Sequence, residues 1–286
     1  MPESVGQTLL RAENVSRVVK GFAQQKMRML QLCQVDSSSV WQESFYREAS
    51  AILTGGTGSA IRGVPRLASF PEVTPTWTKV SAFIEKYAAQ HTISWEDAMT
   101  DNIPVLSRAL ERVGEAIANA VDIQIEAVMN SDAGNSIAIA AGSEWDSATI
   151  SQRSPVTNIL AAVRELFIDN YDAFENGFLV LSPTDYSNLI SNAQLINHPT
   201  FKTISAIENG RVAEVLGLKI IVSNVITADQ AYVIKAKTAI TWKEASPLSV
   251  ITKQEDGISY TIKGWQLGVA QVTDPNAICE ITNTQA

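Results

Sequence analysis

Residues 103–129 read IPVLSRALERVGEAIANAVDIQIEAVM, which is the longest helical pattern in the chain. Their apolar side chains recur every three or four residues, at Ile103, Leu106, Leu110, Val113, Ile117, Val121, Ile125 and Val128. This spacing places an apolar stripe along one side of an α-helix. Thr100 and Asp101 can cap its start, and Pro104 suits its first turn. At 1.5 Å per residue the helix would be ~40 Å long, so we expect it to cross a whole domain.

The segment before this helix favours extended chain. Seven residues exclude a helix between residues 55 and 75: Gly55, Gly56, Gly58, Gly63, Pro65, Pro71 and Pro75. Residues 76–87 then alternate in part as a strand does, with Val80, Ala82 and Ile84 on one side and Trp77, Phe83 and Tyr87 on the other. A stretch of about forty residues without a helix cannot enclose a core of its own. We therefore expect a flap that lies across another surface of this chain or of a neighbour.

Residues 8–33 show a second amphipathic helical pattern. The apolar residues on one side are Val15, Val18, Val19, Phe22, Met29 and Leu30. Three serines follow at residues 37–39. We interpret this helix as an arm, separated from the body, whose apolar side must rest on another surface.

The remaining chain mixes helices and strands and then becomes rich in strands. We expect a helix over residues 155–169, a buried strand over 178–181 and a short helix to Ile190 that begins at a capping sequence, Ser182-Pro183-Thr184-Asp185. After residue 210 the predicted strands are 218–223, 231–235, 239–243, 248–253, 258–263, 267–273 and 277–282. Asp256-Gly257 is typical of a hairpin turn. The expected fold class is α+β.

Composition excludes several classes of protein. The 286 residues include 22 Lys and Arg against 30 Asp and Glu, for a formal net charge of −8, which argues against a dedicated nucleic-acid binder. The apolar runs are far shorter than the ~20 residues that a membrane-spanning helix needs, and basic residues interrupt any signal sequence. Cys33 and Cys279 are isolated, so we expect both thiols to fill the core.

The motifs of enzymes are missing from the sequence. His91 and His198 have no partner at metal-ligand spacing, and the Gly55-Gly56-Thr57-Gly58 loop lacks the Lys-Ser/Thr pair that completes a phosphate loop. Acidic residues 96, 97 and 101 suit the start of a helix without any catalytic role. We predict no catalytic residue, no cofactor and no metal site.

The order of these elements resembles the Hong Kong 97-type major capsid protein of tailed bacteriophages and archaeal tailed viruses. Five segments carry the resemblance: ISWED at 93–97, FLVLSPTDY at 178–186, LGLKIIVS at 216–223, YTIK at 260–263 and VTDPNAI at 272–278. It implies an N-terminal arm over residues 1–45, an extended flap over 46–98, a peripheral domain made of 99–154 and 246–286, and an axial domain over 155–245.

The resemblance also implies a function. It predicts a homo-oligomer of hexamers and pentamers that forms an icosahedral shell around double-stranded DNA, without sequence-specific binding and without a membrane. Portal and scaffolding or accessory proteins would be partners, and the shell would assemble in the host cytoplasm and end in the virion. Candidate contacts between subunits are Val15, Val18, Phe22, Arg62, Arg66, Phe70, Trp77 and Phe83. Two alternatives stay open: an encapsulin-type compartment, and a cytoplasmic α+β enzyme with an unrecognised site.

Overall fold

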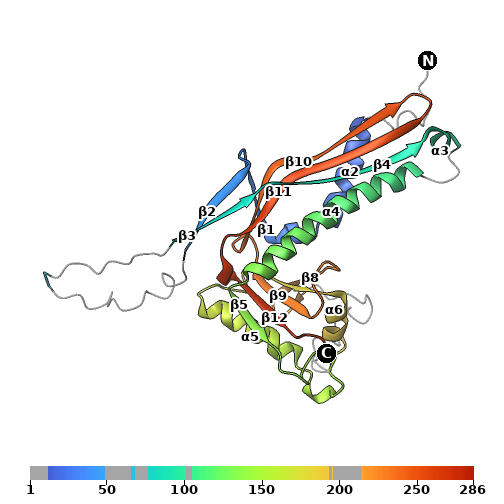
Figure 1. Ribbon diagram of the computed structural model, residues 1–286. Coiled ribbons are helices and arrows are strands. Elements are labelled where there is room, and N and C mark those ends of the chain that lie inside the picture. The colour runs from blue at the N-terminus through green and yellow to red at the C-terminus, as the bar shows by residue number, and fades with distance from the viewer. Residues whose placement is uncertain (1–11, 49–65, 68–76, 101–104, 193–194, 196–213) are drawn as a thin grey trace.

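The computed structural model describes residues 12–48, 66–67, 77–100, 105–192, 195 and 214–286. They form two units, each built on one sheet, and a narrow two-stranded projection (Figure 1). The long helix α4 (Val105–Asp132) runs along the first sheet and ends beside the second unit (Figure 1). Helices and sheets share both cores, which agrees with the predicted α+β class.

The first unit is a four-stranded sheet in the order β1-β10-β11-β4. Its strands are β1 (Cys33–Ser37), β10 (Ile240–Glu255), β11 (Ser259–Val272) and β4 (Glu85–Ser94), and the short helix α3 (Trp95–Thr100) follows β4. Each of the two longest strands joins two segments that the sequence predicted as separate strands. The register of β10 against β11 shifts twice between Glu244 and Ser249, and this irregularity is the break seen in the sequence pattern. The predicted turn is confirmed, with Gly257 at φ +72°.

Helix α4 confirms the long predicted helix and packs its apolar stripe on this sheet. Val113, Ile117, Val121 and Ile125 are buried in the first core. Gly264 of β11 lies directly beneath the helix, because a Cβ added there would be 2.9 Å from Ile117 Cδ1. A glycine at this position therefore allows the helix to approach the sheet closely.

The N-terminal helix is part of the body, so the prediction of a separate arm is wrong for these residues. Helix α2 (Ala12–Lys26) packs on α4, and Val19 and Ala23 are fully buried there. The 3-10 helix η1 (Met29–Leu32) continues into the same core and leads to β1, which pairs in parallel with β10. The side of α2 that carries Val19 and Ala23 is therefore buried against another element of the same chain.

The second unit is a six-stranded sheet in the order β5-β12-β9-β6-β8-β7. Its strands are β5 (Asn135–Ala138), β12 (Ile278–Thr282), β9 (Gln230–Lys235), β6 (Gly177–Leu181), β8 (Leu218–Val222) and β7 (Glu214–Val215). The helical elements are η3 (Ile150–Gln152), α5 (Pro155–Ile168), α6 (Pro183–Ile190) and η4 (Pro275–Ala277). The predicted cap of α6 is confirmed, because Ser182 Oγ accepts the Asp185 backbone N–H at 3.1 Å.

The two faces of the second sheet belong to different cores. Val180, Tyr232 and Ile234 lie in the core that α4 shares, whereas Leu179, Ala231 and Val233 lie in a separate core with α5 and α6. Successive residues of a strand point to opposite faces, which explains the division. Helix α5 therefore covers the side of this sheet that faces away from α4 (Figure 1).

Candidate functional site

The projection consists of two antiparallel strands outside both cores. Strands β2 (Gln42–Glu48) and β3 (Trp77–Phe83) pair with Tyr46 opposite Lys79 and Phe83 opposite Gln42. Residues at alternate positions share a face, so Tyr46 and Phe83 lie on the same one. Their exposed fractions are 61% and 66%, and Trp41 just before β2 is 69% exposed. Within the described part of the chain, the large aromatic side chains of Tyr46 and Phe83 on this face remain exposed.

Two strands alone are only marginally stable in water and need a further surface to pack on. The opposite face of the projection, with Phe45 and Val80, is half-buried. The face with Tyr46 and Phe83 has no such cover among the described residues. The projection is thus a surface whose apolar side chains would be buried by contact with another molecule.

Arg47 connects the projection to the first unit by hydrogen bonds. Its guanidinium donates from Nη2 to Asp132 Oδ2 at 2.5 Å and from Nε to the Val272 carbonyl at 2.8 Å. The cation also lies 5.5 Å from the centre of the Phe45 ring. Because Asp132 ends α4 and Val272 ends β11, one side chain ties the projection to both main elements of the first unit.

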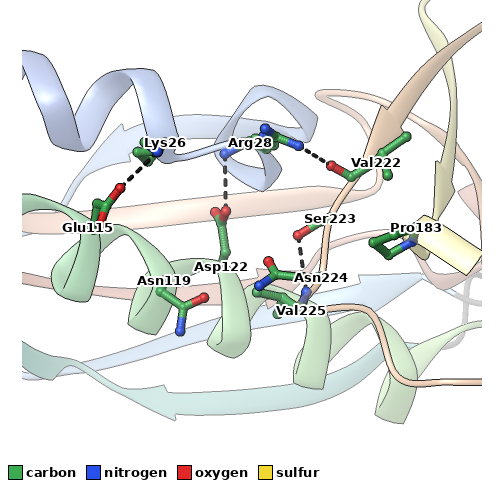
Figure 2. A pocket seen from close by; sticks show the side chains of 10 residues that line it. All are labelled: Lys26, Arg28, Glu115, Asn119, Asp122, Pro183, Val222, Ser223, Asn224 and Val225. Carbon is green, nitrogen blue, oxygen red and sulfur yellow. Dashed lines mark hydrogen bonds and ion pairs between the residues drawn. The ribbon is translucent and has the colours of Figure 1, made fainter. Parts of the chain in front are cut away.

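The N-terminal segment is held on α4 by a buried carboxylate. Asp122, which is 4% exposed, accepts the backbone N–H groups of Arg28 and Met29 at 3.1 and 3.2 Å. Figure 2 shows the first of these two hydrogen bonds. Burial disfavours the ionised form and raises the pKa of Asp122 to about 6, although these two hydrogen bonds act in the opposite direction. The carboxylate therefore replaces the missing helical acceptors at the start of η1.

This junction also joins the two units. Arg28 donates from Nη1 to the Val222 carbonyl at the end of β8, at 2.5 Å, across the edge of a 510 Å³ cavity (Figure 2). One helical turn further along α4, Glu126 accepts both the backbone N–H and the hydroxyl of Thr227, at 3.2 and 2.6 Å. Asp122 and Glu126 thus connect α4 to the N-terminal segment and to the second unit.

The structure places the described members of the predicted contact set on separate elements, in α2, in β3 and at Arg66. Phe83 is exposed on the projection, and Trp77 begins the strand that carries it. Val18 is 37% exposed, while Phe22 is half-buried against α4 near Gly114. Val15 lies in α2, and Arg66 is exposed. Arg62 and Phe70, and the side chains of Val15 and Trp77, lie outside the described residues. The role of these residues in subunit contacts stays a prediction.

The predicted flap ends earlier than its assigned boundary at residue 98. Strand β4 pairs with β11 inside the first unit, and its Tyr87 and Ile93 are buried in the core. A break at Ile84 separates β3 from β4, so Phe83 and Tyr87 do not share a face as the alternation predicted. Sequence reasoning missed Trp41 and Tyr46, although the aromatic residues in WQESFYR at 41–47 were a signal.

Both cysteine side chains of the protein are buried. Cys33 and Cys279 are free thiols in the cores, as predicted, and burial raises the pKa of both, that of Cys279 to about 12. Within the described residues no cluster of three His, Cys, Asp or Glu side chains could hold a metal ion. In the same part of the chain, no helix has the length and apolar character needed to span a membrane.

Known proteins similar to this chain include a protein family and several solved structures. A model of the family described as phage capsid protein matches residues 77–281. The chain is similar to the capsid of the cyanophage P-SCSP1u, with 17% identity, a TM-score of 0.66, and coverage of 88% of this chain and 86% of that one. A structure of Mycobacterium phage Che8 matches with 16% identity and a TM-score of 0.61 over 99% and 93% of the two chains.

A virus-like particle from Pyrococcus furiosus matches with 11% identity and a TM-score of 0.63, over 94% of this chain and 98% of that one. Identities this low show a shared fold. A search of curated protein sequences returns no match.

Proposed function

Because the chain belongs to the phage capsid protein family, we propose that it assembles into hexamers and pentamers that close into an icosahedral shell around double-stranded DNA. It is a structural protein of the viral capsid, and the predicted Hong Kong 97-type fold is confirmed. The family match does not favour the two alternatives, an encapsulin-type compartment and a cytoplasmic enzyme.

The exposed aromatic face of the projection is the observation that supports assembly. Tyr46 and Phe83 are each about two-thirds exposed. An aromatic side chain buries ~150–250 Å², so each has roughly 100 Å² left to cover, worth about 2.5 kcal/mol at ~25 cal/mol per Å². A neighbouring copy would supply this cover for every subunit of a shell.

The net charge of −8 supports a container rather than a binder of DNA. A wall that bound phosphates tightly would oppose both packaging and release, because each neutralised phosphate adds to the affinity. We propose that the DNA is enclosed without sequence-specific contacts. Portal and scaffolding proteins would act with the shell, which would assemble in the host cytoplasm.

Expression of the protein alone, followed by negative-stain microscopy and light scattering, tests assembly directly. We expect closed particles from the wild type. The double variant Tyr46→Ser/Phe83→Ser should raise the concentration needed for assembly by about a hundredfold or more, because each of the two lost contacts removes more than about 1.4 kcal/mol. Ile123→Ser is the matched control, since Ile123 is 49% exposed and isolated on the polar side of α4.

Unchanged assembly of the double variant would contradict the role of the projection. A wild type that stays a monomer or dimer at every concentration would contradict the shell itself and favour the enzyme. The contents of particles purified from cells distinguish a viral shell from an encapsulin-type compartment. Nuclease-protected DNA indicates a virion, whereas an enclosed enzyme indicates a compartment.

A further inference from the structure

A cavity of 510 Å³ lies at the junction between the two units, and the shell contacts proposed above do not use it (Figure 2). Its walls come from the N-terminal segment, from α4, from the start of α6 and from residues 222–225 after β8. Pockets for small molecules commonly measure ~300–1,000 Å³ and often lie at boundaries between structural units. The size and the place of this cavity therefore suit a small molecule.

One wall of the cavity carries the guanidinium of Arg28. Its Nη1 donates to the Val222 carbonyl at 2.5 Å, and this hydrogen bond orients the group across the cavity (Figure 2). Within the described part of the chain, the donors Nε and Nη2 have no hydrogen-bond partner. A planar guanidinium binds phosphate or carboxylate oxygens through two parallel hydrogen bonds. Arg28 is thus preorganised to bind an oxyanion.

A second cation, Lys26, lines the same cavity. Its Nζ forms an ion pair with Glu115 Oε1 at 2.8 Å (Figure 2). The hydrogen bond with Glu115 raises the pKa of Lys26, whereas the charge of Arg28 acts in the opposite direction, so the two cations repel each other. An ammonium group has three N–H donors, and Lys26 can therefore bind an anion while it keeps Glu115. An anion between Lys26 and Arg28 would relieve their repulsion.

The carboxylates of the cavity already have donors. Glu115 binds Lys26, and both oxygens of Asp122 accept backbone N–H groups of the N-terminal segment. The amides of Asn119 and Asn224 also line the cavity and can donate (Figure 2). The donors that remain favour a ligand rich in acceptor oxygens. A phosphate group fits better than a carboxylate, because it has three acceptor oxygens and carries up to two negative charges.

We propose that this cavity, which we call the junction pocket (Lys26, Arg28, Asn119 and Asn224), is a binding site for the phosphate group of a small molecule. The guanidinium of Arg28 and the ammonium of Lys26 bind the phosphate, and the remaining volume holds the rest of the ligand beside the two amides. Because Arg28 also binds Val222, the ligand stabilises the junction between the two units. The proposal does not depend on the shell function, since all of these residues belong to one subunit.

Isothermal titration calorimetry of the full-length protein with inorganic phosphate, at constant ionic strength and pH 8, tests this site. Two charge-assisted hydrogen bonds support a dissociation constant of about 1 mM. Arg28→Met should weaken binding by about tenfold or more, and Arg28→Lys by less, because lysine keeps the charge but lacks the planar fork. Arg164→Met is the matched control, since Arg164 is 69% exposed on α5 and lies outside the pocket. Equal phosphate affinity of Arg28→Met and the wild type would overturn the proposal.

Two further variants distinguish a phosphate site from a purely structural role of Arg28. Lys26→Met should weaken phosphate binding by about threefold, because it removes a cation. Glu115→Gln should strengthen binding by about threefold, because it removes a carboxylate that repels the anion. Neither substitution changes the hydrogen bond from Arg28 to Val222. Unchanged affinity in both variants, or changes of the opposite sign, would overturn the proposal even if Arg28→Met does not fold.

Acetate and a short DNA duplex test the class of ligand. Acetate should bind about tenfold more weakly than phosphate, because it has fewer acceptor oxygens and a smaller charge. Phosphate should also slow hydrogen exchange of residues 222–228 in the wild type and not in Arg28→Met. Equal affinity for acetate would overturn the choice of phosphate. Binding of the duplex that exceeds the affinity for phosphate and requires Arg28 would overturn a small molecule as the ligand.

Discussion

Two glycines inside helices offer a matched test of whether α2 packs on α4. Gly21 of α2 has no atom within 4 Å of the place where a Cβ would lie. At Gly114 of α4 the same Cβ would be 3.1 Å from the Val19 carbonyl oxygen and 3.3 Å from the Ala23 backbone nitrogen. A leucine at Gly114 must therefore displace the backbone of α2, whereas a leucine at Gly21 meets open space.

The expected changes in stability have opposite signs. Replacing a glycine in a helix interior by leucine gains about 0.8 kcal/mol of helix propensity, and at Gly21 nothing opposes this gain. At Gly114 overpacking costs ~1–3 kcal/mol, and the displaced helix also loses the burial of Val19 and Ala23. We expect Gly114→Leu to destabilise the subunit by about 2 kcal/mol in total. At ~2–4 °C per kcal/mol, its Tm should fall by roughly 5 °C, while that of Gly21→Leu rises by about 2 °C.

Thermal circular dichroism of the dissociated subunit measures these shifts, and hydrogen exchange followed by mass spectrometry locates them. Peptides covering residues 17–27 should exchange faster in Gly114→Leu and no faster than the wild type in Gly21→Leu, because only the first substitution separates the two helices. A Gly114→Leu subunit with an unchanged Tm and unchanged protection of α2 would refute the packing of the N-terminal helix on α4.

Two further predictions concern charged groups. The pKa of Asp122 is raised to about 6, above its ordinary 3.8, so its contribution to stability is greatest below the ordinary value and is lost as the pH rises through about 6. Urea unfolding measures the free energy of unfolding of Asp122→Asn relative to that of the wild type. This relative free energy should be about 2 to 3 kcal/mol more favourable to the variant at pH 8 than at pH 4. The same relative free energy at both pH values would contradict the burial of the charge. Arg47→Met should speed hydrogen exchange in β2 and β3 and lower the free energy of unfolding by only about 1–2 kcal/mol. The reason is that the hydrogen bonds from Arg47 to Asp132 and Val272 hold the projection and not the core. Unaltered exchange in β2 and β3 would show that these hydrogen bonds do not hold the projection.

The main elements could be predicted where one periodicity runs through a long segment. The stripe from Leu110 to Ile125 predicted α4, and the Ser182 cap predicted the start of α6, because both signals depend on near neighbours in the chain. The predicted end of the flap at residue 98 was wrong, because a pattern among near neighbours does not show which distant strand a segment pairs with. Alternation in residues 76–87 shows an extended chain but not its partner, and only the pairing of β4 with β11 shows that Tyr87 belongs to the core.

The candidate contact surfaces were harder to predict than the elements that carry them. Phe83 was identified because it is a large aromatic residue in an extended segment, and it is exposed. Leu160 and Phe167 in the predicted helix over residues 155–169 are 45% and 42% exposed, although large apolar side chains in an amphipathic helix usually face a core. Whether an apolar side chain faces a core or the exterior depends on which side of the helix meets the sheet.

Local order alone determined much of this protein: the long helix, the hairpin turn, the capped helix and the thiols of the core follow from propensity and spacing within a few residues. The tertiary structure decided what those elements touch. The N-terminal helix lies on α4 because the side chain of Asp122 accepts two backbone N–H groups from a segment 93 and 94 positions away in the chain, and Gly114 admits its backbone. Short-range sequence patterns cannot predict such contacts, because the residues are far apart in the chain. The free energy of burial depends on which surfaces pack together and not on their order in the sequence.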